Sequence, residues 1–357
     1  MIYAALLWIL IGGVQAGWSA DLSTDLDEAS PYVLEPCFKP IEFQVEAFDA
    51  AGSVRDPLLL AVGEKSVFIL SVSKHGWKNV ACVDPAGRAL TGGFTDAPAQ
   101  KGDPIRFFIS SMLKDGRVQT TFYVFRKGRS QMEGQTTGRI YRNDGPVLVS
   151  QKLAGQAKQP VVVEIPRAGG MPKSLWNLPL PPGTGLFDFA RFPDANRGLS
   201  IRIEGDEDNI ALWEKDQLIS RVSIPVGNPY TELPVDLQEK AGGRRASPQI
   251  LDEGADGTQE IVVAINDPDV GGGFIFSGEN HQSRIAILGV TGAGTNTKLA
   301  VTGVTPIQKG VIPEIGILDS RVLVALVNTK THRTQMHWLH PQNSPGGRGG
   351  QQAIYSN

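Results

Sequence analysis

Short runs of strand-forming residues, separated by turn residues, recur along most of this sequence. Residues 67–72 and 120–125 are examples, and both are rich in the β-branched and aromatic side chains that fit a pleated sheet. Pairs such as Lys127-Gly128 lie between the runs and tolerate the positive φ that a tight hairpin needs. No long stretch keeps the 3.6-residue apolar period of a helix. The sequence therefore predicts an all-β protein.

Several of these runs look like copies of one another. Ile201, Ile261 and Val322 each begin a strand after a polar turn and before a second strand, roughly sixty residues apart. Residues 56–63 fit the same pattern, whereas residues 102–155 fit it least well. This periodicity predicts β-propeller-like repeats of antiparallel strands. The alternative is two β-sandwich-type domains, divided at the proline-rich stretch 158–182.

The first residues are typical of an export signal. Residues 2–11 are apolar, and Val14-Gln15-Ala16 has the small-residue pattern of a cleavage site, with a second candidate site after Ala20. No Lys or Arg precedes the apolar run. We expect a signal peptide over residues 1–20, a secreted or periplasmic protein, and no transmembrane segment in the mature chain.

Charge and cysteine content narrow the class further. The chain has 34 basic and 37 acidic residues, a net charge of -3, so it lacks the basic excess that contacts to nucleic acid would need. Its two cysteines are Cys37 and Cys82. In an exported protein such a pair predicts a disulfide, which would stabilise the fold by about 3–4 kcal/mol.

An acidic loop precedes the run that starts at Ile261. Asp252, Asp256 and Glu260 occupy its first, fifth and ninth positions, and Gly257 permits the turn. Several oxygen ligands in a short loop suit a hard cation. The loop resembles the FG-GAP/VCBS repeat of integrin-type β-propellers, which implies bound structural calcium.

The loop departs from that pattern at its third position, where Gly254 offers no side-chain oxygen. The same residues also fit an ordinary solvated hairpin turn, and this interpretation stays open. The copies before Ile201 and Val322 have lost most of the acidic positions.

Other possible sites are weaker. His337 and His340 lie near the C-terminus, in a segment that reads as a final strand, so they should face opposite sides and not share a metal ion. Asp206, Glu207 and Asp208 fit a polar turn between two strands. Local signatures of common hydrolases and metalloproteases are absent from the sequence.

These observations predict a signal peptide (1–20), an N-terminal β region (21–165), C-terminal propeller-like repeats (166–341) and a flexible tail (342–357). The predicted function is an exported, non-catalytic scaffold that binds a protein or glycan partner at the cell envelope, because such folds leave their loops free for recognition. The alternative is a propeller-type enzyme that acts on glycans with carboxylates from several blades.

Overall fold

The computed structural model describes residues 30–342 with internal gaps. The gaps are 55, 74–75, 97–102, 145–146, 152–159, 165–172, 178–187, 193–197, 205–208, 216, 225, 227–245, 254–257, 268–281, 293–295 and 319–320. The described residues form strands joined by turns and contain no α-helix. None of them belongs to a helix long and apolar enough to cross a membrane. The expected signal peptide (1–20) and most of the tail lie outside the described residues.

Four sheets have four antiparallel strands each, and in each sheet the strands follow chain order. The first sheet contains β2 (Ala47–Ser53), β3 (Asp56–Val62), β4 (Val67–Ser73) and β5 (Gly76–Val83). The second contains β6 (Arg88–Asp96), β7 (Ile105–Met112), β8 (Val118–Arg126) and β9 (Arg129–Thr137). The third contains β10 (Arg139–Asp144), β11 (Val147–Gln151), β12 (Pro160–Glu164) and β13 (Lys173–Asn177). The fourth contains β14 (Phe189–Arg191), β15 (Leu199–Glu204), β16 (Asn209–Glu214) and β17 (Gln217–Ser223).

The remaining strands form a nine-stranded sheet that is two such units joined edge to edge. One unit contains β18 (Gln249–Glu253), β19 (Thr258–Asp267), β20 (Gln282–Thr291) and β21 (Lys298–Val304), with the short β22 (Gln308–Lys309) beside β20. The other contains β23 (Val311–Leu318), β24 (Arg321–Asn328), β25 (Arg333–Pro341) and the N-terminal β1 (Ser30–Pro36). The described strands therefore make six four-stranded units.

The N-terminal strand closes the arrangement. β1 pairs antiparallel with β25, from Tyr32 opposite Pro341 to Pro36 opposite His337. Its first two residues also pair in parallel with β21, through Gly303 and Val304. The two ends of the chain thus complete one unit and attach it to the preceding one.

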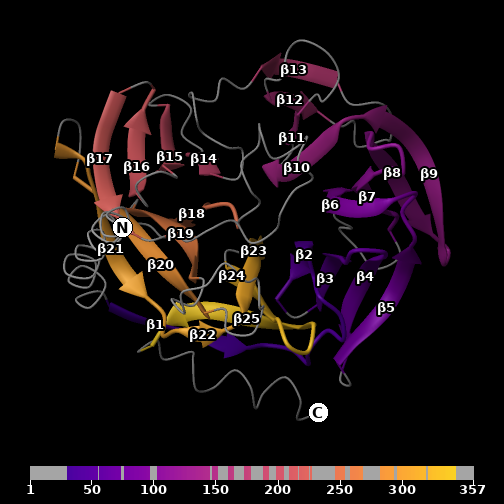
Figure 1. The fold of residues 1–357 in the computed structure, drawn as a ribbon, viewed down its shortest axis with the longest axis horizontal. Helices are drawn as coiled ribbons and strands as arrows, with labels where there is room; N and C mark the ends of the chain where they lie inside the picture. The colour runs from indigo at the N-terminus through magenta and orange to yellow at the C-terminus, as the bar shows by residue number, and fades with distance from the viewer. Residues whose placement is uncertain are drawn as a thin grey trace, which may run out of the picture.

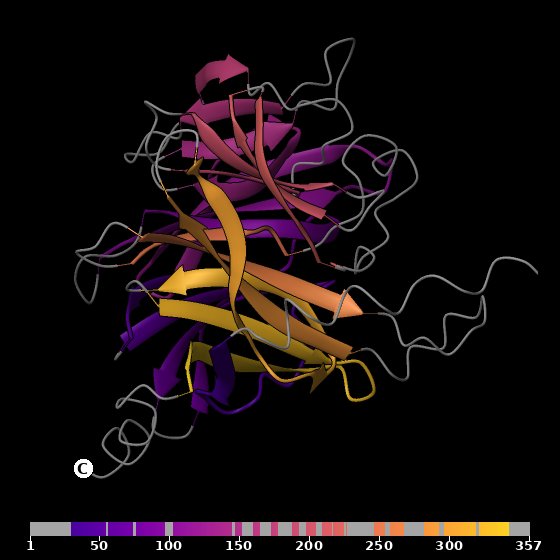
Figure 2. The ribbon, with the colours of Figure 1, turned by 90° about the vertical axis from the view of Figure 1, so that its left-hand side faces the viewer.

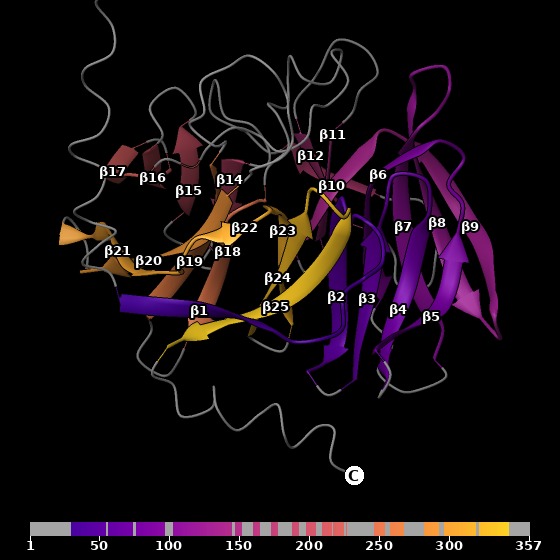
Figure 3. The same cartoon turned by 60° about the horizontal axis from the view of Figure 1, so that its bottom comes forward.

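The six units follow one another around a ring in chain order (Figure 1). The first strand of each unit, namely β2, β6, β10, β14, β18 or β23, lies toward the centre, and successive strands lie further out (Figure 1). Figures 2 and 3 show the same units from the side, each twisted like a blade. This is a β-propeller-like fold, as the repeats predict.

The predicted equivalence of the repeats is confirmed. Ile201, Ile261 and Val322 lie in β15, β19 and β24, each of which is the second strand of its unit, and residues 56–62 form β3, also a second strand. The middle region, which fits the pattern least well by sequence, supplies two further units. The boundary expected between residues 165 and 166 falls inside the third unit, because β12 and β13 pair across it.

Apolar side chains fill the space between neighbouring units. One cluster joins the first two units and includes Leu60, Ile69 and Phe107. Another joins the fourth and fifth units and includes Leu212 and Ile261. The faces of a four-stranded unit thus pack against the neighbouring units. Burial of apolar area between the units is therefore the main stabilising contribution.

Asn266 holds the fifth unit to the sixth. Its side-chain nitrogen donates to the carbonyl of Ile312 (2.9 Å), and its side-chain oxygen accepts from the N–H of the same residue (2.8 Å). The side chain is buried, so both polar groups of Ile312 depend on this amide. Ile312 lies where the pairing of β23 with β24 is irregular, so the amide replaces missing ladder bonds.

We predict that removal of β1 opens the ring. A chain that starts at residue 37 should be less stable than one that starts at residue 30 by about 3–5 kcal/mol, because it loses a strand ladder and the buried Leu34. Chemical denaturation of the two purified chains measures the difference. A peptide of residues 30–36 added in trans should restore part of the loss. Equal stability of the two chains would contradict the closing role of β1.

We also predict that Asn266→Ala destabilises the fold by about 2–3 kcal/mol, because the N–H and C=O of Ile312 remain buried without partners. The matched control is Asn328→Ala. Asn328 also accepts two backbone N–H bonds, from Lys330 and Thr331, but does so at an exposed turn. Its loss should cost less than about 1 kcal/mol, since water replaces it. Similar losses of stability in both variants would contradict this role of Asn266.

Candidate functional site

Asp49 is a half-buried carboxylate on the innermost strand β2. One of its oxygens accepts from the N–H of Phe94 on β6 (2.8 Å), and the other accepts from the N–H of Ala50 (2.9 Å). Burial raises its pKa to about 6, an effect that outweighs these two donors. Gly93 allows this approach, because a Cβ there would lie only 3.2 Å from the Asp49 oxygen. The carboxylate thus joins the first unit to the second.

A second polar group joins the second unit to the third. Arg139, fully buried at the start of β10, donates to the carbonyl of Leu90 on β6 (3.3 Å). Next to it, the Ile140 carbonyl accepts from the Thr91 hydroxyl and the Ile140 N–H donates to Ser110 (3.0 Å). No local pattern signals these groups, since they meet only when distant strands pack.

The predicted calcium ligands lie at the β18–β19 hairpin. Asp252 is in β18 opposite Gln259, Glu260 is in β19 opposite Leu251, and Asp256 lies outside the described residues. Among the described residues, no three His, Cys, Asp or Glu side chains are grouped as a metal site requires. Residues 254–257 of this loop lie outside the described residues, so the calcium site and the ordinary turn both stay predictions.

The expected disulfide does not form in this structure, because Cys37 and Cys82 are both free thiols. Phe38, next to Cys37, packs on Trp77 at the start of β5, with ring centroids 4.8 Å apart. Cys82 lies five residues further along β5, about 17 Å at the usual rise of a strand. A disulfide needs Cα atoms within about 7 Å of each other. Burial raises the pKa of both thiols.

The two C-terminal histidines lie on β25, as the sequence predicts. His337 is buried, and burial lowers its pKa. His340 is more exposed and lies 3.2 Å from a carboxylate oxygen of Glu35 on β1. The two imidazoles have different surroundings, and no group of three potential metal ligands among the described residues includes them. The expected turn at residues 206–208 lies outside the described residues.

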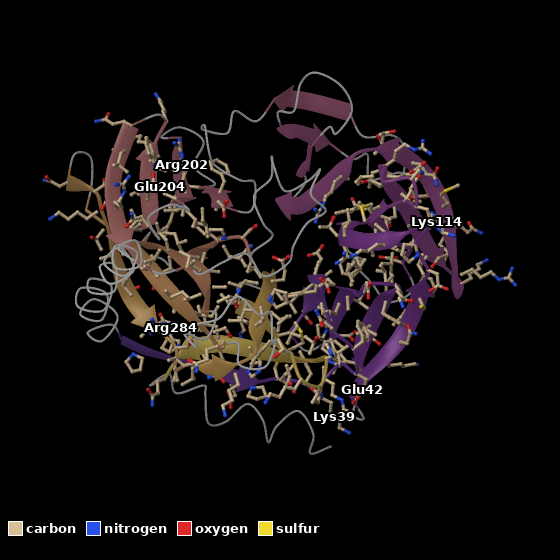
Figure 4. The ribbon with its side chains drawn as sticks, in the orientation of Figure 1. Lys39, Glu42, Lys114, Arg202, Glu204 and Arg284 are labelled. Atoms are coloured by element: carbon tan, nitrogen blue, oxygen red, sulfur yellow. The ribbon has the colours of Figure 1, made fainter. Side chains whose placement is uncertain are left out.

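A polar group on the fourth unit was not anticipated. Arg202 on β15 lies over the ring of Trp213, 4.1 Å from its centroid, and donates to the carbonyl of Lys215 (3.0 Å). Two residues along β15, Glu204 forms an ion pair with Arg221 at 2.6 Å. Arg202 and Glu204 point to the same side of the sheet (Figure 4). The alternation of charged and apolar residues in β15 was the signal that could have revealed this face.

A shallow hollow of about 240 Å³ lies at one end of the second unit. Its lining comes from the β7–β8 turn, the start of β8 and the end of β9, and combines amide, hydroxyl, guanidinium and aliphatic groups: Leu113, Arg117, Val118, Gln119, Gln135, Thr136 and Thr137. Asp115 holds the guanidinium of Arg117 at 2.7 Å, and this contact lowers the pKa of Asp115. Lys114 lies at the outer side of the same turn (Figure 4). Such a lining can hydrogen-bond a polar ligand.

We predict that Asp49→Asn removes a pH-dependent part of the stability. Because its pKa is raised from 3.8 to about 6 in the folded state, Asp49 favours folding below about pH 4, and that contribution is lost as pH rises to about 6. The free energy of unfolding of the wild type, relative to the variant, should fall by about 2 kcal/mol across this window. Denaturation at pH 4, 5, 6 and 7 measures it.

The control for that prediction is Asp115→Asn. The pKa of Asp115 is lowered, so its carboxylate is charged in the folded state throughout the window, and the difference from wild type should change little and in the opposite direction. If the difference in unfolding free energy between wild type and Asp49→Asn also stayed constant with pH, the raised pKa of Asp49 would be contradicted.

Comparison with known proteins reveals similarity at the level of structure alone. No protein-family model matches this sequence. No curated protein matches it either. Its most similar solved structures include a putative 6-phosphogluconolactonase from Bacteroides uniformis, 11% identical, which matches over 82% of this chain and 83% of that chain with a TM-score of 0.43.

The soluble aldose sugar dehydrogenase from Escherichia coli is 12% identical, over 87% of this chain and 100% of that chain, with a TM-score of 0.41. A GH43_1 enzyme from Xanthomonas citri is 9% identical, over 87% and 90% of the two chains, with a TM-score of 0.35. At these identities and TM-scores the likeness does not extend to activity. The fold assignment rests on the arrangement of the sheets in this chain.

Proposed function

We propose that this chain is an exported, propeller-like scaffold that binds a protein or glycan partner at the cell envelope without converting it. The observation that carries the proposal is how the polar side chains between units near the ring centre are used. Asp49 accepts two backbone N–H bonds, and Arg139 donates to a backbone carbonyl. Both groups serve to hold units together.

The outer parts of the ring supply groups suited to recognition. The hollow beside β9 offers amides and hydroxyls, whereas the buried guanidinium of Arg202 is used within the fourth unit, on the Trp213 ring and the Lys215 carbonyl. Such polar groups on a rigid sheet are suited to orienting a bound partner. This chemistry indicates a partner with a polar surface, such as a glycan or a protein.

Calcium belongs to this proposal as a structural ion. Asp252, Asp256 and Glu260 would supply its oxygen ligands, as the resemblance of this loop to the FG-GAP/VCBS repeat implies. The ion would fix the β18–β19 hairpin, and so stabilise the fifth unit without taking part in any reaction.

Binding and turnover can be measured on the same protein. The chain that starts at Asp21 is applied to an array of purified glycans and, separately, to solubilised envelope proteins, and each captured molecule is then titrated as a pure component. We expect saturable binding, with the captured glycan or protein recovered unchanged after long incubation. Cleavage or oxidation of a bound glycan would instead support a propeller-type enzyme.

We predict that calcium raises the melting temperature of this chain by a few degrees and that excess chelator reverses the rise, because an ion that binds only the folded state stabilises it by mass action. Asp256→Ala should abolish the calcium effect. Asp115→Ala, which removes an acid from the exposed β7–β8 turn, should preserve it. Identical melting with calcium and with chelator would leave the loop as an ordinary turn.

A further inference from the structure

The outermost strand of the second unit is unusually open. β9 has nine residues, and most of their side chains are exposed. It pairs with β8 on one side and with no described strand on the other, although it approaches β5. Its outer edge therefore presents free N–H and C=O groups along about 30 Å.

The β8–β9 hairpin carries three cations in four residues. Lys127 and Gly128 form its loop with φ values of 49° and 77°, so Arg126 and Arg129 lie directly opposite each other. Like charges in directly opposed positions repel and destabilise a hairpin. Arg126, Lys127 and Arg129 are exposed, and within the described part of the chain none of them forms an ion pair. An anionic group bound between the two guanidinium groups would offset this repulsion.

An apolar side chain lies near the middle of the same strand. Met132 is 61% exposed, more than any other large apolar side chain of the described residues. Methionine is unbranched and polarizable, and adapts to partners of varied shape. The edge of β9 therefore combines backbone hydrogen-bonding groups, an apolar centre and a cationic end.

Two other outer edges of the ring, those of β21 and β17, are more protected. β1 pairs with the edge of β21, which shows that this fold accepts an added strand at the outside of a unit. On β17, the Ser220 hydroxyl accepts from the N–H of Leu299 on the neighbouring unit (3.0 Å). β9 is also the longest strand at the outer edge of any four-stranded unit described.

We propose that an extended segment of a partner protein adds to the edge of β9 as a fifth strand, with acidic residues beside the Arg126–Arg129 pair and an apolar residue beside Met132. The row of backbone groups favours a peptide over a glycan, because only another strand can satisfy them in register. This inference rests on the proposed binding function and names its partner and its site.

The alternation of an antiparallel ladder identifies which backbone groups are free. Arg126 and Arg129 flank a two-residue loop and exchange hydrogen bonds, so the next position, Ser130, directs its N–H away from β8. Replacement of Ser130 by proline removes one outward donor and leaves the bonds between β8 and β9 in place. It is therefore a selective test of strand addition.

The probe is a synthetic nine-residue peptide of alternating Thr and Val, with three Asp at one end and a fluorescent label. Its affinity for the chain that starts at Asp21 is measured by fluorescence anisotropy. We expect saturable binding that weakens with added salt. The double variant Arg126→Glu/Arg129→Glu and the variant Ser130→Pro should each bind at least about tenfold more weakly. The control Lys114→Glu removes an exposed cation at the other end of β8 and should bind within about twofold of wild type.

Two further peptides separate backbone pairing from simple charge attraction. The same peptide with N-methyl groups at alternate residues keeps its charge but cannot pair as a strand, and should bind at least about tenfold more weakly. The peptide with Lys in place of Asp should not bind. No binding of the acidic peptide, or equal binding by wild type and both β9 variants, would overturn the inference. The glycan array or the envelope titration could identify a partner whose affinity is unchanged by the β9 substitutions. That result would support the proposed function and contradict only the β9 site.

Discussion

The pairing of β1 with β25 is the interaction on which the rest of the ring depends. Residues 30–36 find their partners some three hundred positions away, and without them the edges of both β25 and β21 would be unpaired. Contacts between the two ends of a chain are entropically costly to form and come late in folding. Once formed, they leave the first, second, fifth and sixth units each packed between apolar clusters on both sides, so none of these four can separate from the ring without loss of buried apolar area on both faces.

Polar side chains then fix how neighbouring units meet. Asp49, Thr91 and Asn266 each bond the backbone of the next unit, at places where strands from two sheets come together. Apolar packing is nondirectional and would tolerate small slides between sheets, whereas a hydrogen bond to a chosen N–H or C=O fixes one register. The burial of Asp49 shows that this specificity is gained at some cost in stability at neutral pH.

The parts of the fold that the sequence predicts are those with local causes. The positive φ of Lys127 and Gly128 follows from turn chemistry, and the equivalence of Ile201, Ile261 and Val322 follows from a repeated strand pattern. Ring closure, the Asp49 bond to Phe94 and the Arg202–Trp213 contact depend on packing between segments that no local pattern connects. The disulfide prediction rests only on the presence of two cysteines in an exported chain, and it is wrong in this structure. Cys82 lies near the end of β5, whereas Cys37 lies next to Phe38, which packs on Trp77 at the start of that strand. The candidate calcium loop is predicted from its residue types and their spacing, whereas what it binds depends on its three-dimensional shape.

The closing strand also affects how the protein is made. β1 is the first strand of the ring to leave the ribosome, or to cross a membrane if the chain is exported, and β25 is the last. Throughout that interval β1 has both edges unpaired and carries apolar residues such as Leu34 that are later buried. A nascent chain of this design needs its first strand kept from pairing with other chains until its own final strand arrives. Synthesis rate and holding chaperones would therefore govern its yield more strongly than the stability of the finished ring.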